Sequence, residues 1–427
     1  ETLKMLIDMK KKLQKVKDTG FFHIMISNII KNILAFISGI IIVRVIPKAD
    51  YGIYSYANNI ISYFMLFSGL GISSAVFQVC CERRKNGEIP QDIFGYGVTW
   101  GYLINCIIGF FIVIYSLYIH SDVTGADKYL IWMSFIPSVN IIFDFTTIYF
   151  RSKSDNKSYA YVYLVSAVST FVFSIMGSLL FGIWGMIASN YLTPVVATIF
   201  ARIKKRYKTS LIFRLGRKDS IDIWKLAITS MAANAISSVM YLIDISMIGL
   251  FLKDELAIAS YKIATIIPTA LVFLASTIVA YIYPYFAEHI DDIPWTKVMA
   301  RKILLGCSGL FGIIAMLMFI LAHPILTLVF GNQYSDAVGV FRILSISFFF
   351  QCAFRTIFGN LLVSQRKLKF NLIESILTGI INVVGDYFFI QRFKAEGVAM
   401  TTLLVMIFSG VLAMSYYFYS IHKKEKS

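Results

Sequence analysis

Long apolar stretches alternate with short polar gaps along the whole chain, and this pattern predicts membrane-spanning helices. Each stretch reaches the roughly 20 residues that an α-helix needs to cross about 30 Å of hydrocarbon. Lipid offers the backbone no hydrogen bonds, so each spanning segment must pair its own N–H and C=O groups as a helix. The twelve predicted segments are 22–46, 54–79, 96–118, 128–150, 158–181, 183–203, 223–251, 256–284, 302–322, 338–363, 370–390 and 397–421.

Composition and charge agree with a membrane protein. Hydrophobic residues make up 58% of the chain, which is more apolar surface than one water-soluble core hides. Most of the 40 Lys and Arg residues lie in every second gap, which predicts that these gaps and both termini are cytoplasmic. Because the basic residues are scattered over seven short segments, they form no continuous groove for nucleic acid. The opposite loops hold only Lys48, Lys128, Lys253, Arg392 and Lys394.

The second half of the chain echoes the first at a shift of about 205 residues. Residues 53–56, Ile-Tyr-Ser-Tyr, align with residues 258–261, Ile-Ala-Ser-Tyr. We therefore expect an all-α integral membrane fold, with twelve transmembrane helices in two pseudo-symmetric six-helix bundles around a central cavity. The expected parts are an amphipathic interfacial helix at 1–21, an N-terminal bundle at 22–203, a basic cytoplasmic linker at 204–222, a C-terminal bundle at 223–421 and a cytoplasmic tail at 422–427.

Several predicted helices carry a stripe of polar residues. Single Ser or Thr residues in such stripes are explained by close helix packing and interhelical hydrogen bonds. Charged residues in a stripe indicate a water-filled cavity or a charged partner, because charge in hydrocarbon costs at least a few kcal/mol. The candidate stripe residues are Asn28, Lys31 and Asn32 in segment 22–46, Asn234, Tyr241 and Asp244 in segment 223–251, and Asp386 in segment 370–390.

Deep ionisable residues are the most informative chemistry in the sequence. Three cations stand against three carboxylates, namely Lys31, Lys262 and Arg355 against Asp144, Asp244 and Asp386. One interpretation is purely structural, with the six forming salt bridges. The other is a hydrophilic cavity whose cations hold an anionic substrate while its carboxylates bind H⁺ or Na⁺ or switch partners. Residues near segment ends are expected to reach toward the membrane surface as anchors. They are Arg44, Lys225, Arg342 and Glu374.

Enzyme chemistry finds no support in the sequence. There is no phosphate-binding loop, and the cysteines and histidines have no metal-ligand spacing. No loop exceeds about twenty residues, so we expect no soluble catalytic domain, no resident metal and no cofactor.

Four short motifs resemble a known family. Residues 44–56 read Arg-Val-Ile-Pro-Lys-Ala-Asp-Tyr-Gly-Ile-Tyr-Ser-Tyr, and residues 67–72 read Phe-Ser-Gly-Leu-Gly-Ile. Two further motifs follow along the chain: residues 182–188 read Gly-Ile-Trp-Gly-Met-Ile-Ala, and residues 259–264 read Ala-Ser-Tyr-Lys-Ile-Ala. This set is similar to the Wzx-type polysaccharide flippases of the multidrug/oligosaccharidyl-lipid/polysaccharide exporter superfamily, and it implies a MATE-like fold.

The resemblance implies a function and a set of site roles. It implies a flippase of the bacterial cytoplasmic membrane that moves undecaprenyl-diphosphate-linked oligosaccharide from the inner to the outer leaflet. Lys31, Arg355 and Arg44 are then expected to attract the diphosphate, Lys262 and Arg342 to receive it outside, and a carboxylate to couple transport to H⁺ or Na⁺. Polysaccharide polymerase and glycosyltransferases are the expected partners. A cation-coupled multidrug exporter and a peptidoglycan-precursor flippase of the same superfamily stay open as alternatives.

Overall fold

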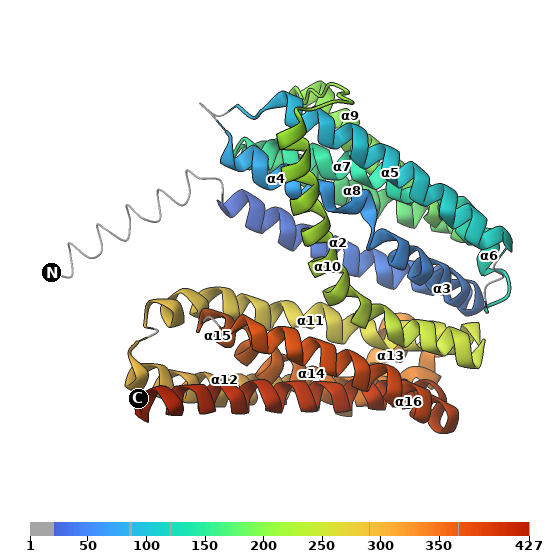
Figure 1. Ribbon diagram of the computed structural model, residues 1–427. Helices are drawn as coiled ribbons and strands as arrows, with labels where there is room; N and C mark the ends of the chain where they lie inside the picture. Colours follow the sequence, from blue (N-terminus) through green and yellow to red (C-terminus); the bar gives the residue numbers. More distant parts are fainter. Residues whose placement is uncertain (1–20, 85–87, 119–121, 290, 366, 427) are drawn as a thin grey trace. The chain divides into compact units, whose positions relative to one another are not determined.

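The computed structural model describes residues 21–84, 88–118, 122–289, 291–365 and 367–426 (Figure 1). These residues form helices and connecting loops, and no β-strand of two or more residues occurs among them. The all-α fold class is therefore confirmed. The amphipathic helix expected at 1–21 lies outside the described residues except for its last position.

The first six predicted segments all overlap helices. Two of them are broken rather than continuous. The second bends at the 3-10 turn η1, where Gly69 and Gly71 have φ of 52° and 78°, a left-handed region that favours glycine. The helices are α2 (Phe21–Val45), α3 (Lys48–Met65), η1 (Ser68–Gly71), α4 (Ile72–Glu82), α5 (Gln91–Tyr118), α6 (Ala126–Met133), α7 (Ile136–Ser152), α8 (Asn156–Phe181) and α9 (Ile183–Lys205).

The fourth segment bends by 40° between α6 and α7. Tyr191 of α9 satisfies the backbone at this break. Its hydroxyl donates to the Trp132 carbonyl over 2.7 Å and accepts from the Phe135 N–H over 3.2 Å. A side chain from a neighbouring helix thus supplies the hydrogen bonds that lipid cannot.

The last six predicted segments also overlap helices. A π-helix, η3, interrupts the tenth segment, and α16 contains a break at Lys394, where φ is 52° and ψ is −133°. The helices are α10 (Arg217–Leu252), α11 (Glu255–Glu288), α12 (Ile293–Ile320), α13 (Ala322–Phe330), η2 (Asn332–Ala337), α14 (Val338–Phe350), η3 (Gln351–Thr356), α15 (Ile357–Ser364) and α16 (Leu368–Lys426).

The described helices make this a multi-pass membrane protein. Nine of them are long and apolar enough to cross a bilayer, or ten if α6 and α7 form one span. The last of the nine, Ile373–Lys423, contains the break at Lys394, and α10 contributes a shorter apolar stretch, Leu242–Leu252. Twelve crossings therefore stay a prediction.

The described residues pack as two compact units. Of the described residues, unit 1 comprises those within 21–47, 57–118 and 125–238, and unit 2 comprises those within 48–56, 122–124 and 239–426. The division falls inside α10, because Trp224 donates to the Tyr96 hydroxyl over 3.0 Å and packs edge-on against Trp100. Likewise the start of α3 belongs to unit 2, where Lys48 forms an ion pair of 2.6 Å with Asp336.

Residues 204–222, expected as a tether, pack partly into unit 1. Tyr207 is buried among core aromatic residues, and its ring lies 5.1 Å from that of Tyr149. The Ile212 N–H donates to the Thr99 hydroxyl over 2.9 Å. Only glycine fits at Gly95, because a Cβ there would lie 2.6 Å from the Ser210 carbonyl oxygen. This segment is therefore a fixed part of unit 1.

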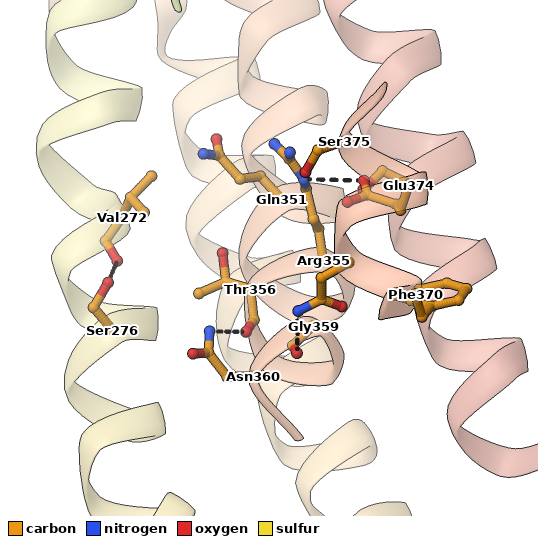
Figure 2. Close-up of a pocket in the computed structure, with 13 residues that line it drawn as sticks. Val272, Ser276, Gln351, Arg355, Thr356, Gly359, Asn360, Phe370, Glu374 and Ser375 are labelled. Carbon is orange, nitrogen blue, oxygen red and sulfur yellow. Dashed lines mark hydrogen bonds and ion pairs between the residues drawn. The ribbon is translucent and has the colours of Figure 1, made fainter. Parts of the chain in front are cut away.

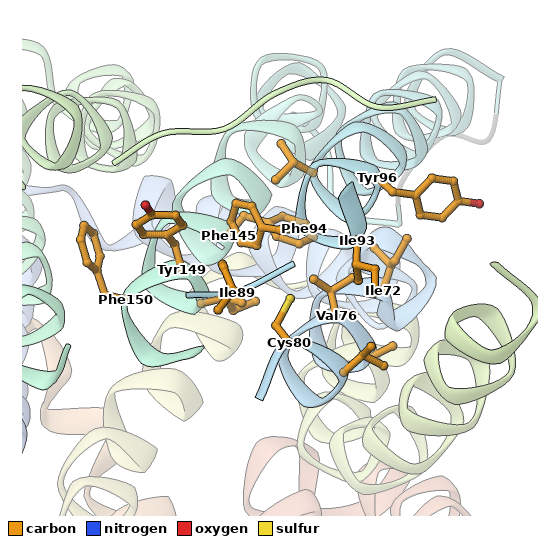
Figure 3. Packing of buried hydrophobic residues seen from close by; sticks show 14 of the residues in the cluster. Ile72, Val76, Cys80, Ile89, Ile93, Phe94, Tyr96, Phe145, Tyr149 and Phe150 are labelled. Atoms are coloured by element: carbon orange, nitrogen blue, oxygen red, sulfur yellow. The ribbon is translucent and has the colours of Figure 1, made fainter. Parts of the chain in front are cut away.

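A cluster of buried hydrophobic residues in unit 1 includes several aromatic residues from α5 and α7 (Figure 3). Phe94 packs edge-on against Phe145 and Tyr149, with ring centroids 5.8 and 5.5 Å apart. Gly97 and Gly101 let α5 approach Phe145, since a Cβ at either position would lie within 3.1 Å of its ring. These contacts pack α7, the helix that carries Asp144, closely against α5.

Candidate functional sites within the membrane helices

A cluster of oxygen atoms in unit 2 surrounds the carboxylate of Asp244. The carboxylate accepts from the Tyr261 hydroxyl of α11 in a short hydrogen bond. It also accepts from the Thr402 hydroxyl over 2.9 Å and from the Asn382 amide over 3.3 Å, both in α16. Three donors from two other helices therefore contact the Asp244 carboxylate.

Asp386 lies beside this cluster and is completely buried. Among the described residues, neither of its carboxylate oxygens has a hydrogen-bond partner, and neither has the Asn382 carbonyl oxygen. A negative charge on Asp386 would be repelled by a negative charge on Asp244. Gly385 permits this packing, because a Cβ there would lie 2.6 Å from the Thr401 methyl group. A buried carboxylate without a partner needs a proton or a cation.

The donor set of this cluster suits a proton or a hard monovalent cation. Carboxylate, amide and hydroxyl oxygens are the ligands that hard cations prefer. Across the described residues, no group of three or more His, Cys, Asp or Glu side chains could hold a metal ion. The cluster is therefore unlike a transition-metal site.

A second charged group lies in unit 1. The Lys31 ammonium group of α2 donates to the Tyr163 hydroxyl of α8 over 2.6 Å and lies 4.3 Å from the centroid of that ring. It also attracts the carboxylate of Asp144, which is exposed on α7. Asn28 is half-buried and Asn32 is exposed on α2. The Tyr163 hydroxyl therefore positions Lys31, which has no carboxylate within 4.0 Å among the residues that the structure describes.

A polar pocket of about 350 Å³ lies within unit 2 beside the π-helix η3 (Figure 2). Gln351, Arg355 and Thr356 of η3 all line it. A π-helical turn is rare, and such turns occur frequently at functional sites. Residues of α11, α15 and α16 form the remaining walls. The pocket is therefore a polar site enclosed by largely apolar helices.

Arg355 forms an ion pair of 3.6 Å with Glu374 in this pocket (Figure 2). Glu374 is 7% exposed and also accepts a short hydrogen bond from Ser409. The expectation that Glu374 is a surface anchor is therefore wrong, because helix α16 turns it inward. The sequence suggested an anchor because Glu374 lies near the start of the predicted segment 370–390. The sequence did contain a sign of the inward position: Glu374 follows Asn371 by three residues, so the two share one face of the helix. Both residues line the pocket.

The other predicted site residues are not gathered into these clusters. Lys262 is half-buried on α11 and has no ion-pair partner among the described residues. Arg44, Asn234 and Arg342 are exposed, and the Arg342 guanidinium lies 5.6 Å from the Phe319 ring centroid. The side chain of Tyr241 lies outside the described part of the chain.

The purely structural interpretation of the six deep charges is not supported inside either unit. Within each unit's described residues, no ion pair of 4.0 Å or less joins one of Lys31, Lys262 and Arg355 to one of Asp144, Asp244 and Asp386. The Arg355 partner is Glu374. Of the six, Lys31 and Asp244 have neutral hydrogen-bond partners among the described residues.

Comparison with known proteins places the chain in a family. Residues 19–289 match the family model described as polysaccharide biosynthesis protein. The chain belongs to this polysaccharide biosynthesis protein family. A curated relative, the succinoglycan biosynthesis transport protein ExoT of Rhizobium meliloti (strain 1021), is 20% identical over 319 residues. That alignment covers 74% of this chain and 62% of the relative, so the chain spans about three fifths of the relative's length.

Solved structures support the fold of this family member. An inward-facing multidrug resistance MATE family transporter matches with a TM-score of 0.69 and 13% identity, covering 93% of this chain and 96% of that one. The lipid II flippase MurJ in an inward closed conformation matches with a TM-score of 0.71 and 13% identity, covering 93% and 87%. The MATE-like fold is therefore confirmed.

Proposed function

We propose that the protein is a flippase for undecaprenyl-diphosphate-linked oligosaccharide in the bacterial cytoplasmic membrane. It moves the repeat unit from the inner to the outer leaflet by alternating access. The observation that carries this proposal is the family match over residues 19–289, together with the transport relative in succinoglycan biosynthesis.

Physical chemistry explains why such a substrate needs a protein with buried charge. The sugar and diphosphate groups cannot enter hydrocarbon without losing their hydration, while the lipid tail can stay in the bilayer. Cations inside apolar helices lower this cost for the diphosphate. Lys31, held by Tyr163, and the unpaired Lys262 supply them, and the exposed Arg44 and Arg342 attract the headgroup more weakly.

We assign cation coupling to the cluster of Asp244 and Asp386. In the cycle, a proton or Na⁺ occupies the space beside Asp386 and is released when the cluster opens. This assignment is supported by the two unpartnered carboxylate oxygens and the unpartnered Asn382 carbonyl oxygen. Asp144, beside Lys31, is the second switch carboxylate in this scheme. Glycosyltransferases would supply the substrate, and a polymerase would consume it.

Complementation of a strain that lacks its own repeat-unit flippase tests the proposal, with surface polysaccharide as the readout. The wild-type chain should restore polysaccharide, and Lys31→Ala and Asp386→Asn should abolish it at unchanged membrane levels. Lys225→Ala, the same change at an exposed lysine on α10, should retain it. Normal function of both Lys31→Ala and Asp386→Asn would contradict the assignment.

The same strains separate the two alternatives. Efflux of ethidium without restored polysaccharide would identify a multidrug exporter. Rescue of cells depleted of their lipid II flippase, without restored polysaccharide, would identify a peptidoglycan-precursor flippase.

A further inference from the structure

We propose that the pocket beside η3 in unit 2 binds an oxyanion, and that each bound oxyanion brings one proton onto Glu374. Binding itself is independent of the transport role. Only the biological source of the oxyanion, a phosphate or an acidic sugar of the transported lipid, rests on the proposed function.

The first observation that supports the proposal is that most N–H donors of the Arg355 guanidinium have no acceptor among the described residues. A guanidinium group has five N–H donors. Here its Nε lies 3.6 Å from Glu374, too long for a strong hydrogen bond, and one Nη contacts the Met406 sulfur over 3.6 Å. Among the described residues it donates to no oxygen atom within hydrogen-bond distance. Because its side chain is 19% exposed in a cavity, its free donors can hold an oxyanion in a bidentate way.

The second support is the set of neutral polar groups around this cation. Asn360 and Asn371 use their amide nitrogens to donate to the backbone carbonyls of Thr356 and Gly359, over 2.8 and 3.0 Å. This fixes both amides in the pocket wall. A volume of about 350 Å³ lies in the range of small-ligand sites. It suits one sugar ring or phosphate group, not a whole oligosaccharide.

Glu374 links the binding of an oxyanion to the uptake of a proton. In the empty pocket its charge is balanced by Arg355, so the pair is neutral. An oxyanion that binds Arg355 takes away this balance and leaves Glu374, 7% exposed, with only the Ser409 hydroxyl. An unpaired buried carboxylate is costly, so Glu374 takes up a proton from water and becomes a neutral acid. For a monoanion such as glucuronate, this proton returns the net charge of the occupied pocket from −1 to zero; for a dianion such as sulfate, it reduces the net charge from −2 to −1.

No other ionisable group competes in the described pocket wall. Helix α11 contributes Val272 and Ser276, α15 contributes Gly359 and Asn360, and α12 contributes no lining residue. From η3 and α16 the only titratable or charged residues in the lining are Arg355 and Glu374. The proton therefore goes to Glu374.

Binding to the purified full-length protein in detergent tests this. The probes are sulfate, glucuronate and glucose, whose charges stay constant between pH 5.5 and 8. Isothermal titration in two buffers of different ionisation enthalpy counts the protons taken up per bound probe. We expect one proton per anion and an affinity that falls about tenfold per pH unit. Sulfate binding would indicate a phosphate-type ligand, and glucuronate binding an acidic sugar.

Matched variants complete the test. Glu374→Gln should bind anions with no pH dependence, Arg355→Gln should lose binding, and the exposed Arg301→Gln of α12 should bind as wild type. Binding of glucose alone, anion binding without proton uptake, or no binding of any probe overturns the inference. The proton count needs only the wild-type protein, so a variant that fails to fold does not remove the test. Normal polysaccharide export by Arg355→Gln together with loss in Lys31→Ala would rule out the transported lipid as the source of the oxyanion, while the proposed function stands.

Discussion

The replacement of Asp386 by Asn should stabilise the protein, and by more as the pH rises. Asn has almost the same shape but cannot carry the charge that Asp386 holds without a partner. The wild-type side chain escapes the cost of a buried charge by binding a proton, so the native state holds one proton more than the unfolded state. By linkage, wild-type stability then falls as pH rises, whereas the Asn variant lacks this dependence.

The magnitude follows from the reference behaviour of a carboxyl group. An aspartate in an unfolded chain has a pKa of about 3.9. For each pH unit above this value, the free energy needed to keep the side chain protonated rises by about 1.4 kcal/mol. The gain from Asp386→Asn is therefore up to about 3 kcal/mol at pH 6 and up to about 6 kcal/mol at pH 8.

Thermal or denaturant unfolding in detergent, from pH 5.5 to 8 in choline buffer, measures the gap in unfolding free energy between Asp386→Asn and wild type. Addition of Na⁺ should narrow it at high pH if Na⁺ is the coupling ion and leave it unchanged if H⁺ is. Asp291→Asn, an exposed carboxylate, is the control and should show no such slope. A gap that stays constant with pH, or an Asn variant less stable than wild type at pH 8, would refute the reasoning.

Three further changes test other parts of the structure. Phe145→Ala should lower the free energy of unfolding by about 3–5 kcal/mol, because the ring is fully buried; unfolding in detergent measures this. Gly185→Val should prevent stable folding, seen as lost membrane accumulation, because even a Cβ there would lie 1.9 Å from the Gly177 carbonyl oxygen. Tyr163→Phe should reduce polysaccharide export by about tenfold, the worth of one charge-assisted hydrogen bond to Lys31. Export equal to wild type would show that the hydroxyl does not position Lys31.

Hydropathy alone located the helices, because each spanning segment must satisfy its own backbone and therefore leaves a local signal. The breaks were harder to see. Pro137 lies at the start of α7, but the bend before it depends on Tyr191, 54 residues later. The unit boundary within α10 depends on contacts of Trp224 with α5, which no local pattern records.

The candidate sites show the same division between local and long-range information. Lys31, Asp244, Asp386 and Arg355 stand out in sequence because charge is rare in hydrocarbon. Their partners do not stand out, since Tyr163, Thr402 and Ser409 are ordinary residues of membrane helices. Glu374 was misplaced because depth in the membrane was judged from its position in a segment rather than from its neighbours.

Translocation by the purified protein tests the central claim most directly. The protein is reconstituted into liposomes that carry undecaprenyl-diphosphate-linked oligosaccharide, and a membrane-impermeant lectin reports sugar that reaches the outer leaflet. The account predicts protein-dependent translocation that responds to an H⁺ or Na⁺ gradient in wild type and loses this response in Asp386→Asn. Absence of translocation by wild type, or equal gradient response in both proteins, would contradict it.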